Sequence, residues 1–457
     1  MKSDIIIIGG GAAGLMAAYG AASQLRAMGR DESVTILEKM PRPGRKIMIT
    51  GKGRCNFTNV KDWNAFSGHI RSKSNFVKPA FFNLTPEKLI EFFGSVGMEA
   101  VVERGDRAFP ASYHSTDVID ALVRACQGAG VKIETEAEVS SVELAEDGGG
   151  KPLRFELSTA DQRRFSCRRL IIATGGLSYP NTGSTGDGYR FASETGHSIT
   201  PLFPSLTALV PKGYKLTTEK DLHIDRSAPC SEFGEMLKGI QLKNVGAQLL
   251  IEGTLADSEF GDIDFTDGGL EGPIGFQLSR KAVKALINGS RVSIVLDLKH
   301  GVPLTELTTR VKELWAQIDK DPRSRGVREK EKCRILLGKL MPWELIPAFR
   351  AAHPGIITLE RRGRTDSKVW VNLVSIAKAL KEWKFDIAGH VGYERAVVTA
   401  GGVSTDDVIA KTLESRKVEG LYFCGELLDV DSDTGGYNLH TAFATGLLAG
   451  QSAAKSL

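Results

Sequence analysis

The feature that most constrains this chain is the sequence DIIIIGGGAAGLMAAYGAASQLRAMG near its N-terminus. An apolar run leads into a glycine turn and then into a segment rich in small residues. Gly9, Gly11 and Gly14 fit the spacing G-x-G-x-x-G. In that pattern the first glycine makes a tight turn, the second lets the backbone approach a pyrophosphate, and the third lets the helix pack on the strand. The helix N-terminus, with Ala12 and Ala13, would meet the phosphates with free N–H groups.

A second strand supplies the context that a dinucleotide fold needs. The sequence VTILEK (34–39) ends in Glu38 and Lys39. Glu38 lies 24 residues after Gly14, near the roughly 20 residues at which an acidic residue binds a ribose hydroxyl. We therefore predict a dinucleotide site that includes Glu38 and Lys39. The alternative is an ordinary turn in a βαβ unit.

Length and composition are typical of a globular protein. The chain has 457 residues, of which 42% are hydrophobic and 25% are charged. Two or three domains are expected at this length. Lys and Arg exceed Asp and Glu by only 4. Because nucleic-acid-binding proteins concentrate cations on one face, this small excess argues against a nucleic-acid partner.

The cysteines and the N-terminus indicate a cytoplasmic protein. No C-x-x-C pair occurs among the six cysteines, which stand at 55, 126, 167, 230, 333 and 424. That spacing argues against a zinc knuckle, a disulfide framework or a dithiol pair, and reduced thiols are expected. The N-terminus lacks the features of a signal peptide, and no apolar run approaches the roughly 18 residues of a membrane span. The histidines show no metal-binding spacing, so we predict no metal.

Five segments together carry a resemblance to a known family. They are DIIIIGGGAAGL, GRKIMITGKGRCNFTN, ATGGLSYPNTGSTGDGY, VVTAGGVS and GLYFCGELLDVDSDTGGYNLHTAFATGLLAG. With these motifs the chain resembles the BaiN-type flavoproteins. These are FAD-dependent oxidoreductases that include aminoacetone-oxidase-like and bile-acid-reductase-like members. The resemblance implies noncovalently bound FAD as the cofactor.

The resemblance also implies an α/β fold. This is a glutathione-reductase-like FAD-binding Rossmann domain, discontinuous in sequence, with an inserted β-barrel domain that carries a small helical subdomain. AQLLIEG and RVSIVLDL in the middle of the chain are strand-like, whereas LTELTTRVKELWAQI has helical spacing. We expect the FAD domain at 1–198 and 385–457, the inserted barrel at 199–384, and the helical subdomain at about 303–365.

The C-terminal motif TGGYNLHTAFATGLLAG predicts a glycine pair followed by a helix with many small residues. Glycines let backbone approach a flat ring, and the positive end of the helix favours negative charge nearby. The resemblance implies that Gly425 and Glu426 meet the ribityl and phosphate part of FAD. It also implies that the isoalloxazine ring meets Gly435, Gly436, Tyr437, Asn438 and Leu439. The alternative is a packed terminal helix with a glycine cap.

The segment that follows the Glu38 strand is predicted to run past the diphosphate towards the flavin ring. It contains two cations for the phosphates, two glycines for close backbone approach and three short polar side chains for ring heteroatoms: Arg45, Lys46, Gly51, Gly53, Thr50, Asn56 and Thr58. A P-loop is excluded by its spacing and by the absence of Ser or Thr after Lys52. By resemblance, Val139 meets the adenine, and Ala173, Thr174 and Gly175 form a further contact strip.

Two residues are candidates for catalysis. His440 replaces a glutamine that many relatives carry, and histidine can transfer a proton near neutral pH; the alternative is that it packs in the core. Cys55 stands beside Arg54, but no resolving cysteine is near in sequence, so a structural or flavin-contacting role is preferred. The loop TDGGLEGP (266–273) also departs from the relatives' TH-x-G-x-SGP, which weakens any analogy of substrate.

We interpret the chain as an FAD-dependent oxidoreductase that transfers a hydride between flavin and a small organic substrate. Only one dinucleotide fingerprint is present, so NAD(P)H, a candidate electron donor, would dock without its own Rossmann domain. One alternative is an oxidase of a small amine that uses oxygen. An alternative of another class is an RNA-binding flavoprotein, favoured by the basic sequence KDPRSRGVREKEKCR but opposed by the acidic residues within it.

Overall fold

The computed structural model describes residues 1–145, 154–217, 221–362 and 366–457. The chain divides into two compact units. Unit 1 consists of Met1–Ser205 and Ala396–Leu457, and unit 2 consists of Leu206–Arg395. None of the helices in the described part of the chain combines the length and apolar composition that a membrane span requires.

Five parallel strands form the central sheet of unit 1, in the order β21-β10-β1-β2-β6. Their bounds are β1 Ile5–Ile8, β2 Val34–Leu37, β6 Lys132–Glu134, β10 Arg169–Ile172 and β21 Leu421–Phe423. All of β1 is buried, as expected for a parallel sheet covered on both faces. The glycine turn after β1 therefore lies at the carboxyl edge of the sheet, where open α/β sheets bind ligands.

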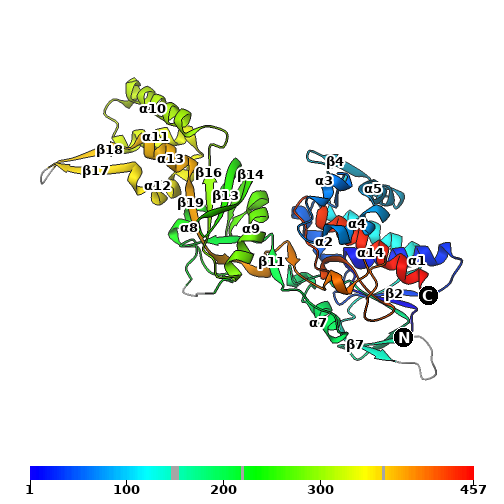
Figure 1. Ribbon diagram of the computed structural model, residues 1–457. Helices are drawn as coiled ribbons and strands as arrows, with labels where there is room; N and C mark the ends of the chain where they lie inside the picture. The colour runs from blue at the N-terminus through cyan, green and yellow to red at the C-terminus, as the bar shows by residue number, and fades with distance from the viewer. Residues whose placement is uncertain (146–153, 218–220, 363–365) are drawn as a thin grey trace. The chain divides into compact units, whose positions relative to one another are not determined.

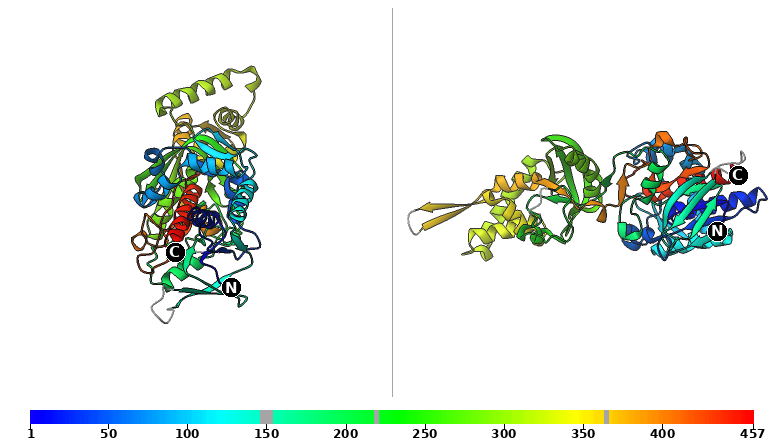
Figure 2. Two further views of the ribbon diagram at one scale, coloured as in Figure 1. Left: turned by 90° about the vertical axis from the view of Figure 1, so that its right-hand side faces the viewer. Right: turned by 90° about the horizontal axis from the view of Figure 1, so that it is seen from below.

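Helices α1 (Ala12–Ala27) and α14 (Tyr437–Lys455) pack side by side although they come from opposite ends of the chain (Figures 1 and 2). Their glycines make the contact close. A Cβ at Gly450 would lie 1.9 Å from the carbonyl oxygen of Ala17, and one at Gly446 would lie 2.2 Å from that of Ala13. The two ends of the chain thus form one Rossmann-type domain, discontinuous in sequence.

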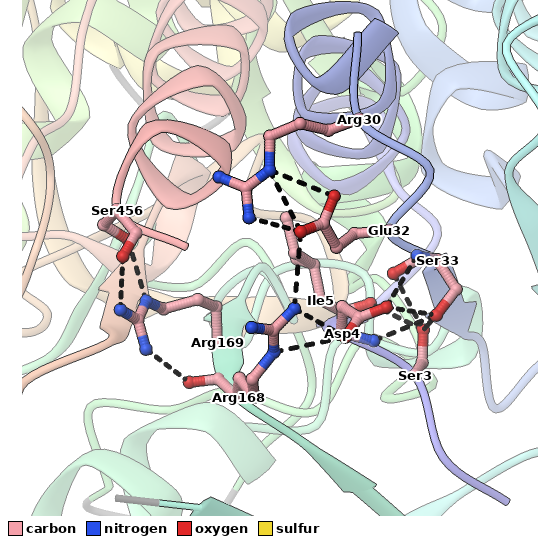
Figure 3. Close-up of polar contacts among 9 residues, drawn as sticks. All are labelled: Ser3, Asp4, Ile5, Arg30, Glu32, Ser33, Arg168, Arg169 and Ser456. Atoms are coloured by element: carbon pink, nitrogen blue, oxygen red, sulfur yellow. Dashed lines mark hydrogen bonds and ion pairs between the residues drawn. The ribbon is translucent and has the colours of Figure 1, made fainter. Parts of the chain in front are cut away.

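Polar contacts at the amino edge of the sheet hold the chain termini in place (Figure 3). Arg168, just before β10, donates to the Asp4 carboxylate at 2.8 Å. Arg169 donates to Ser456 Oγ, after α14, at 2.8 Å. The Arg168–Asp4 ion pair is partly exposed, and such pairs contribute little free energy. We therefore assign these contacts mainly to alignment of the first strand with the end of the chain.

The rest of unit 1 surrounds this sheet. Two further sheets have the orders β3-β5-β4 and β7-β8-β9, and β11 pairs with β20. The bounds of these strands are β3 Thr58–Asn59, β4 Ala100–Glu103, β5 Arg107–Pro110, β7 Val139–Ala145, β8 Arg154–Thr159, β9 Arg164–Cys167, β11 Phe203–Ser205 and β20 Val398–Ala400. The helices are α2 Arg45–Ile49, α3 Trp63–Ser67, α4 Ser74–Asn83, α5 Pro86–Ser95, α6 Ser115–Gly128 and α7 Asp187–Glu194.

Six strands close a barrel in unit 2, in the order β12-β15-β14-β13-β16-β19. Their bounds are β12 Leu209–Pro211, β13 Gln241–Ile251, β14 Thr254–Thr266, β15 Gly269–Glu271, β16 Val292–Asp297 and β19 Trp383–His390. Helix α9 (Gly272–Ile287) packs on β14, and α8 spans Glu232–Leu237. The predicted β-barrel is therefore present within an α/β protein.

A group of helices is inserted between β16 and β19. It consists of α10 Leu304–Lys320, α11 Glu329–Leu340, α12 Ile346–Ala352 and α13 Leu373–Lys381. A hairpin of β17 (Ile357–Arg362) and β18 (Asp366–Val371) separates α12 from α13 (Figure 1). The expected helical stretch of 303–365 therefore includes one strand of the hairpin and omits α13; residues 363–365 lie outside the described residues.

The unit boundaries differ by a few residues from 198/199 and 384/385. Strand β11 pairs with β20 within unit 1, so the chain leaves this unit after Ser205. Strand β19 continues the barrel to His390, so the chain returns at Ala396. Hydrogen-bonded pairing decides both positions, and the composition of the sequence does not change there.

Candidate functional site

The turn between β1 and α1 has the geometry of a phosphate-binding turn. A Cβ at Gly9, where φ is +103°, would lie 2.6 Å from the Ala173 carbonyl oxygen, and one at Gly14 would lie 1.8 Å from the Gly9 oxygen. A Cβ at Gly11 would meet nothing within 4 Å. Packing of the chain therefore requires glycine at the first and third positions, whereas the second position leaves open space. The unpaired N–H groups of the helix begin here, in Ala12 and Ala13, which suits a pyrophosphate.

Glu38 closes this turn from the end of β2. Its Oε2 accepts from the Gly10 N–H at 2.6 Å, and its Oε1 accepts from the Met40 N–H at 2.7 Å. Burial raises the pKa of this carboxyl, although the two backbone donors oppose the rise. A carboxylate has about four lone-pair sites, so two acceptor positions remain for ribose hydroxyls. The Ala137 N–H donates to the Glu38 carbonyl at 2.9 Å, which brings the start of β7, with the buried Val139, to this side of the sheet.

A largely buried ion pair joins α2 to η8 (Gly425–Leu427). Lys46 Nζ donates to Glu426 Oε2 at 2.8 Å and to Ser178 Oγ at 2.8 Å. Glu426 Oε1 accepts from Ser178 Oγ at 2.5 Å and from the Thr399 N–H at 2.9 Å. Burial acts to raise the pKa of Glu426, but Lys46 and the donors outweigh it and lower the pKa. The Glu426 carboxylate is thus bound by other groups of the protein, and these bonds fix the backbone of the η8 turn.

We expect Glu426→Gln to lower the free energy of unfolding at neutral pH by about 1.5–3 kcal/mol, the range for hydrogen bonds to a charged group. Because folding lowers the pKa of Glu426 from 4.5, this stabilisation is present above pH 4.5 and is lost as the pH falls through the folded pKa. Urea denaturation of wild type and variant across this range measures the difference. Glu419→Gln is the matched control, because Glu419 is exposed and forms no ion pair within the described residues. A difference that does not change with pH would contradict this account.

The segment after α2 adopts the irregular backbone that its glycines predict. Thr50 Oγ1 donates to the Lys46 carbonyl at 3.0 Å. In η1 (Thr50–Gly53) the backbone is left-handed at Gly51, with φ of +60°, and at Gly53, with φ of +87°. The chain then enters β3, so the loop carries its polar residues directly from the ion pair of Lys46 to the start of α14.

Asn56 and Thr58 lie against the glycine pair before α14. A Cβ at Gly436 would lie 2.5 Å from the Thr58 carbonyl and 2.8 Å from Asn56 Oδ1. Asn56 Oδ1 is buried and has no hydrogen-bond partner in the part of the chain that the structure describes. Because an unsatisfied buried acceptor costs about 1–3 kcal/mol, a ligand donor is expected at this atom.

The start of α14 is held by one of its own side chains. Asn438 Oδ1 accepts from the Ser432 N–H at 2.9 Å, and Nδ2 donates to the Ser432 and Asp433 carbonyls at 2.9 and 3.1 Å. Its side chain therefore fixes the loop before the helix. Gly435 and Gly436 have φ of +116° and +97°, Tyr437 begins the helix, and Leu439 packs against the core of unit 1. The positive end of the helix lies here.

The remaining predicted residues lie on both sides of the glycine turn between β1 and α1. Lys39 pairs with Asp187 at 2.7 Å, so its ammonium is engaged by α7. Arg45 forms no ion pair among the described residues. Ala173 packs under Gly9, and Thr174 Oγ1, next to it, is buried without a partner in the described chain. In Gly175, the last residue of this strip, φ is +75°.

The two catalytic candidates are both fully buried. His440 Nδ1 lies 2.9 Å from Thr58 Oγ1, and its ring contacts those of Phe66 and Phe81. Burial lowers the pKa of His440 to about 3, although the Leu84 carbonyl opposes this. Burial raises the pKa of the Cys55 thiol to about 12. Packed side chains surround both groups, and His440 Nε2 has no hydrogen-bond partner in the part of the chain that the structure describes. A role of either residue in turnover stays a prediction.

Comparison with known proteins identifies the family. Residues 3–452 match the HI0933-like protein Rossmann domain family. The chain belongs to this family. A 3-dehydro-bile acid delta(4,6)-reductase from Clostridium scindens is 32% identical over 98% of both chains. A ribosomal RNA dihydrouridine synthase from Haemophilus influenzae is 31% identical over 97% of this chain and 96% of its own. The solved structure of a 3-ketosteroid delta1-dehydrogenase from Sterolibacterium denitrificans aligns over 100% of both chains with a TM-score of 0.51 and 14% identity, which shows a shared fold.

This HI0933-like protein is an FAD-dependent oxidoreductase, as the resemblance implied. Its residues fit the cofactor. The open position at Gly11 leaves room for a pyrophosphate, Asn56 Oδ1 offers a buried acceptor, and the buried Thr174 hydroxyl can donate to a ligand or accept from it. These positions lie at the carboxyl edge of the sheet or beside α14, within unit 1.

Two residues of the site were missed in the sequence. Ser178 bridges Lys46 and Glu426, and Thr399 Oγ1 accepts from the N–H groups of Leu177 and Ser178 at 2.8 and 3.1 Å. Both stand inside segments that carry the family resemblance, ATGGLSYP and VVTAGGVS. The two segments therefore indicated a functional site. No spacing rule connects Ser178 with Thr399, because they lie far apart in the chain.

In unit 2, the unusual loop TDGGLEGP forms an ionic cluster. Arg395 donates to Glu271 at 3.0 Å and also pairs with Asp267. Arg226 pairs with Asp267 as well, at 3.7 Å. Burial raises the pKa of Glu271, and the Arg395 guanidinium opposes the rise. Where the family pattern has a histidine and a serine, this chain therefore has two carboxylates that share the Arg395 guanidinium.

Proposed function

We propose that this protein reduces a carbon–carbon double bond conjugated to a carbonyl group, with FAD as the hydride carrier. The observation that supports the proposal is what two relatives have in common: they are named as a 3-dehydro-bile acid delta(4,6)-reductase and a ribosomal RNA dihydrouridine synthase. A 3-oxo-delta(4,6) system and the uracil ring each hold such a bond, and each named reaction saturates one. A site that acts on both substrates would therefore recognise the conjugated double bond that they share.

Bound, reduced FAD would supply the hydride. The chain binds and orients the cofactor through the glycine turn at Gly11 and the carboxylate of Glu38. The positive end of α14 favours negative charge beside it, by about 0.3–1 kcal/mol when exposed and up to ~2 kcal/mol when partly buried. Lys46 and Glu426 hold the turn at η8 against α2. We propose NAD(P)H as the electron donor, docked without a second Rossmann domain.

A uridine in RNA is a second candidate substrate, and a local excess of charge favours it. Residues 303–381, which hold α10–α13 and the β17–β18 hairpin, contain 17 Lys and Arg against 9 Asp and Glu, a net charge of +8 where the whole chain has +4. The exposed Arg325, Arg328 and Lys330 form no ion pairs within the described residues, and Trp343 is 51% exposed. Cations that follow a phosphate backbone and aromatic faces that stack bases are features of RNA-binding surfaces. The small net charge of the whole chain conceals this excess.

Anaerobic half-reactions test the proposal. We expect NADH or NADPH to bleach the flavin of the purified holoenzyme. We then expect at least one of three probes to reoxidise it: 2-cyclohexen-1-one, 4-androstene-3,17-dione or a uridine-containing RNA. The product should gain two hydrogens across the double bond, and cyclohexanone, which lacks that bond, is the control. Reduction by a small amine together with reoxidation by oxygen alone would contradict a reductase and support the oxidase alternative.

A further inference from the structure

Two short segments of unit 1 that are far apart in sequence meet in front of α14. Residues 69–71 follow α3, and residues 431–433 precede the glycine pair. The Asp433 N–H donates to the His69 carbonyl oxygen at 2.9 Å. Next to this bond, Ile70 and Ser432 form an antiparallel bridge. The backbones that carry His69 and Asp433 are therefore fixed against each other.

The side chains of these two residues form a dyad. His69 Nδ1 lies 3.0 Å from Asp433 Oδ2. Asp433 is almost fully buried, with 3% of its side chain exposed, whereas 34% of the His69 side chain is exposed. Arg71 binds the other carboxylate oxygen. The carboxylate accepts from Nδ1, so Nδ1 carries the proton and Nε2 is the reactive nitrogen.

The imidazole plane is fixed as well. It stacks on the ring of Tyr437, with centroids 4.3 Å apart and planes 18° apart. Tyr437 is the first residue of α14, directly after Gly435 and Gly436. Within the described residues Nε2 makes no hydrogen bond. A histidine that is oriented by a buried carboxylate, and free at its other nitrogen, is the arrangement that general acid–base catalysis uses.

We propose that His69 is the proton donor of the reaction, and that Asp433 is the residue that positions it. The assignment rests on the proposed function. The β-carbon of the conjugated double bond would receive a hydride supplied by reduced FAD, and the electron pair of the broken π bond would move towards the carbonyl. The proton on Nε2 of the His69 imidazolium then forms the C–H bond at the α-carbon. His69 is left neutral, and one proton taken up from the solvent through the exposed edge of the ring restores the imidazolium.

Other groups near the start of α14 are less suited to this step. His440 and Cys55 are 0% exposed, so neither can exchange a proton with water. Burial, together with the charge of Asp433, raises the pKa of the Tyr437 phenol, which holds its proton. The Asp433 carboxylate contacts the His69 ring, and the Arg71 guanidinium binds the same carboxylate.

Variants of the holoenzyme test the donor role. We expect His69→Gln and His69→Ala to keep FAD and to be reduced by dithionite as wild type is. Reoxidation by whichever of the three probes acts on wild type should fall by about 10²–10⁴, the usual contribution of a general acid. Imidazole in the buffer should restore part of the rate of His69→Ala, and reoxidation by oxygen should be unchanged. His114→Gln, on an exposed histidine at the start of α6, is the control.

A second measurement does not depend on turnover. In nitrogen-15 spectra of wild type, neutral His69 should carry its proton on Nδ1, and Asp433→Asn should change this preference. Probe-driven rates of the His69 variants equal to wild type, or a neutral His69 in wild type whose proton lies on Nε2 and not on Nδ1, would overturn the donor role alone. A wild-type enzyme that none of the three probes reoxidises would contradict the proposed function, and the donor role with it.

Discussion

Gly11→Val is expected to give a folded protein that retains little or no FAD after purification. The Gly11 backbone is extended, with φ of −80° and ψ of −168°, which valine adopts readily. A Cβ there would meet nothing within 4 Å, so the fold should lose at most about 1 kcal/mol, from a weaker N-cap. The added side chain would instead occupy the place that we predict for the pyrophosphate. A clash of about 3 kcal/mol would weaken binding about 100-fold, because each 1.4 kcal/mol is tenfold. Flavin absorbance per chain, with circular dichroism for folding, measures both.

Two further glycines provide the controls for this result. Gly94→Ala in α5, where a Cβ also meets nothing, should retain FAD and gain about 0.4–1 kcal/mol of stability. Gly14→Val should disrupt the fold itself, because its Cβ would lie 1.8 Å from the Gly9 carbonyl oxygen. A Gly11→Val protein with a full complement of FAD would show that the pyrophosphate lies elsewhere.

The glycine motifs explain why the fold could be predicted from sequence. Gly9 and Gly14 have steric roles that only one type of turn imposes, and the small residues of α14, such as Gly446 and Gly450, allow contact with α1. Each of these steric requirements is visible in a short stretch of sequence. The barrel followed from the family resemblance, because short β-branched runs alone do not determine whether a sheet closes.

The polar partners in the site could not be predicted in the same way. The contact of Glu426 with the cofactor stays a prediction, whereas the bond of its carboxylate to Lys46, which is 380 positions away in the chain, appears only in the fold. His69 and Asp433 are separated by 364 positions and belong to no spacing rule. His440 departs from the family pattern, which made it a candidate for catalysis. Its burial beside Phe66 and Phe81 depends on tertiary packing, which the sequence pattern does not give.

Burial of His440 is expected to make the stability of unit 1 depend on pH. The pKa of His440 falls from 6.5 to about 3 on folding, so between these values the unfolded chain binds a proton that the folded chain does not. Stability from this group is therefore complete above pH 6.5 and decreases as the pH falls below it. The loss should reach about 3 kcal/mol by about pH 4.5, since each unit of pKa difference is worth 1.36 kcal/mol.

His440→Gln should remove this dependence, because glutamine does not titrate. Urea-induced release of FAD, which reports unfolding of unit 1, should show a steeper loss of stability for wild type than for the variant as the pH falls from about 6.5 to 4.5. Above pH 7 the histidine is neutral in both states, so the two proteins should differ there by a constant amount. That amount measures the lost contacts with Thr58 and Phe66. If the stability curves of the two proteins stay parallel over the whole range, His440 must bind a proton in the folded state as readily as in the unfolded state. That result would contradict the burial of His440.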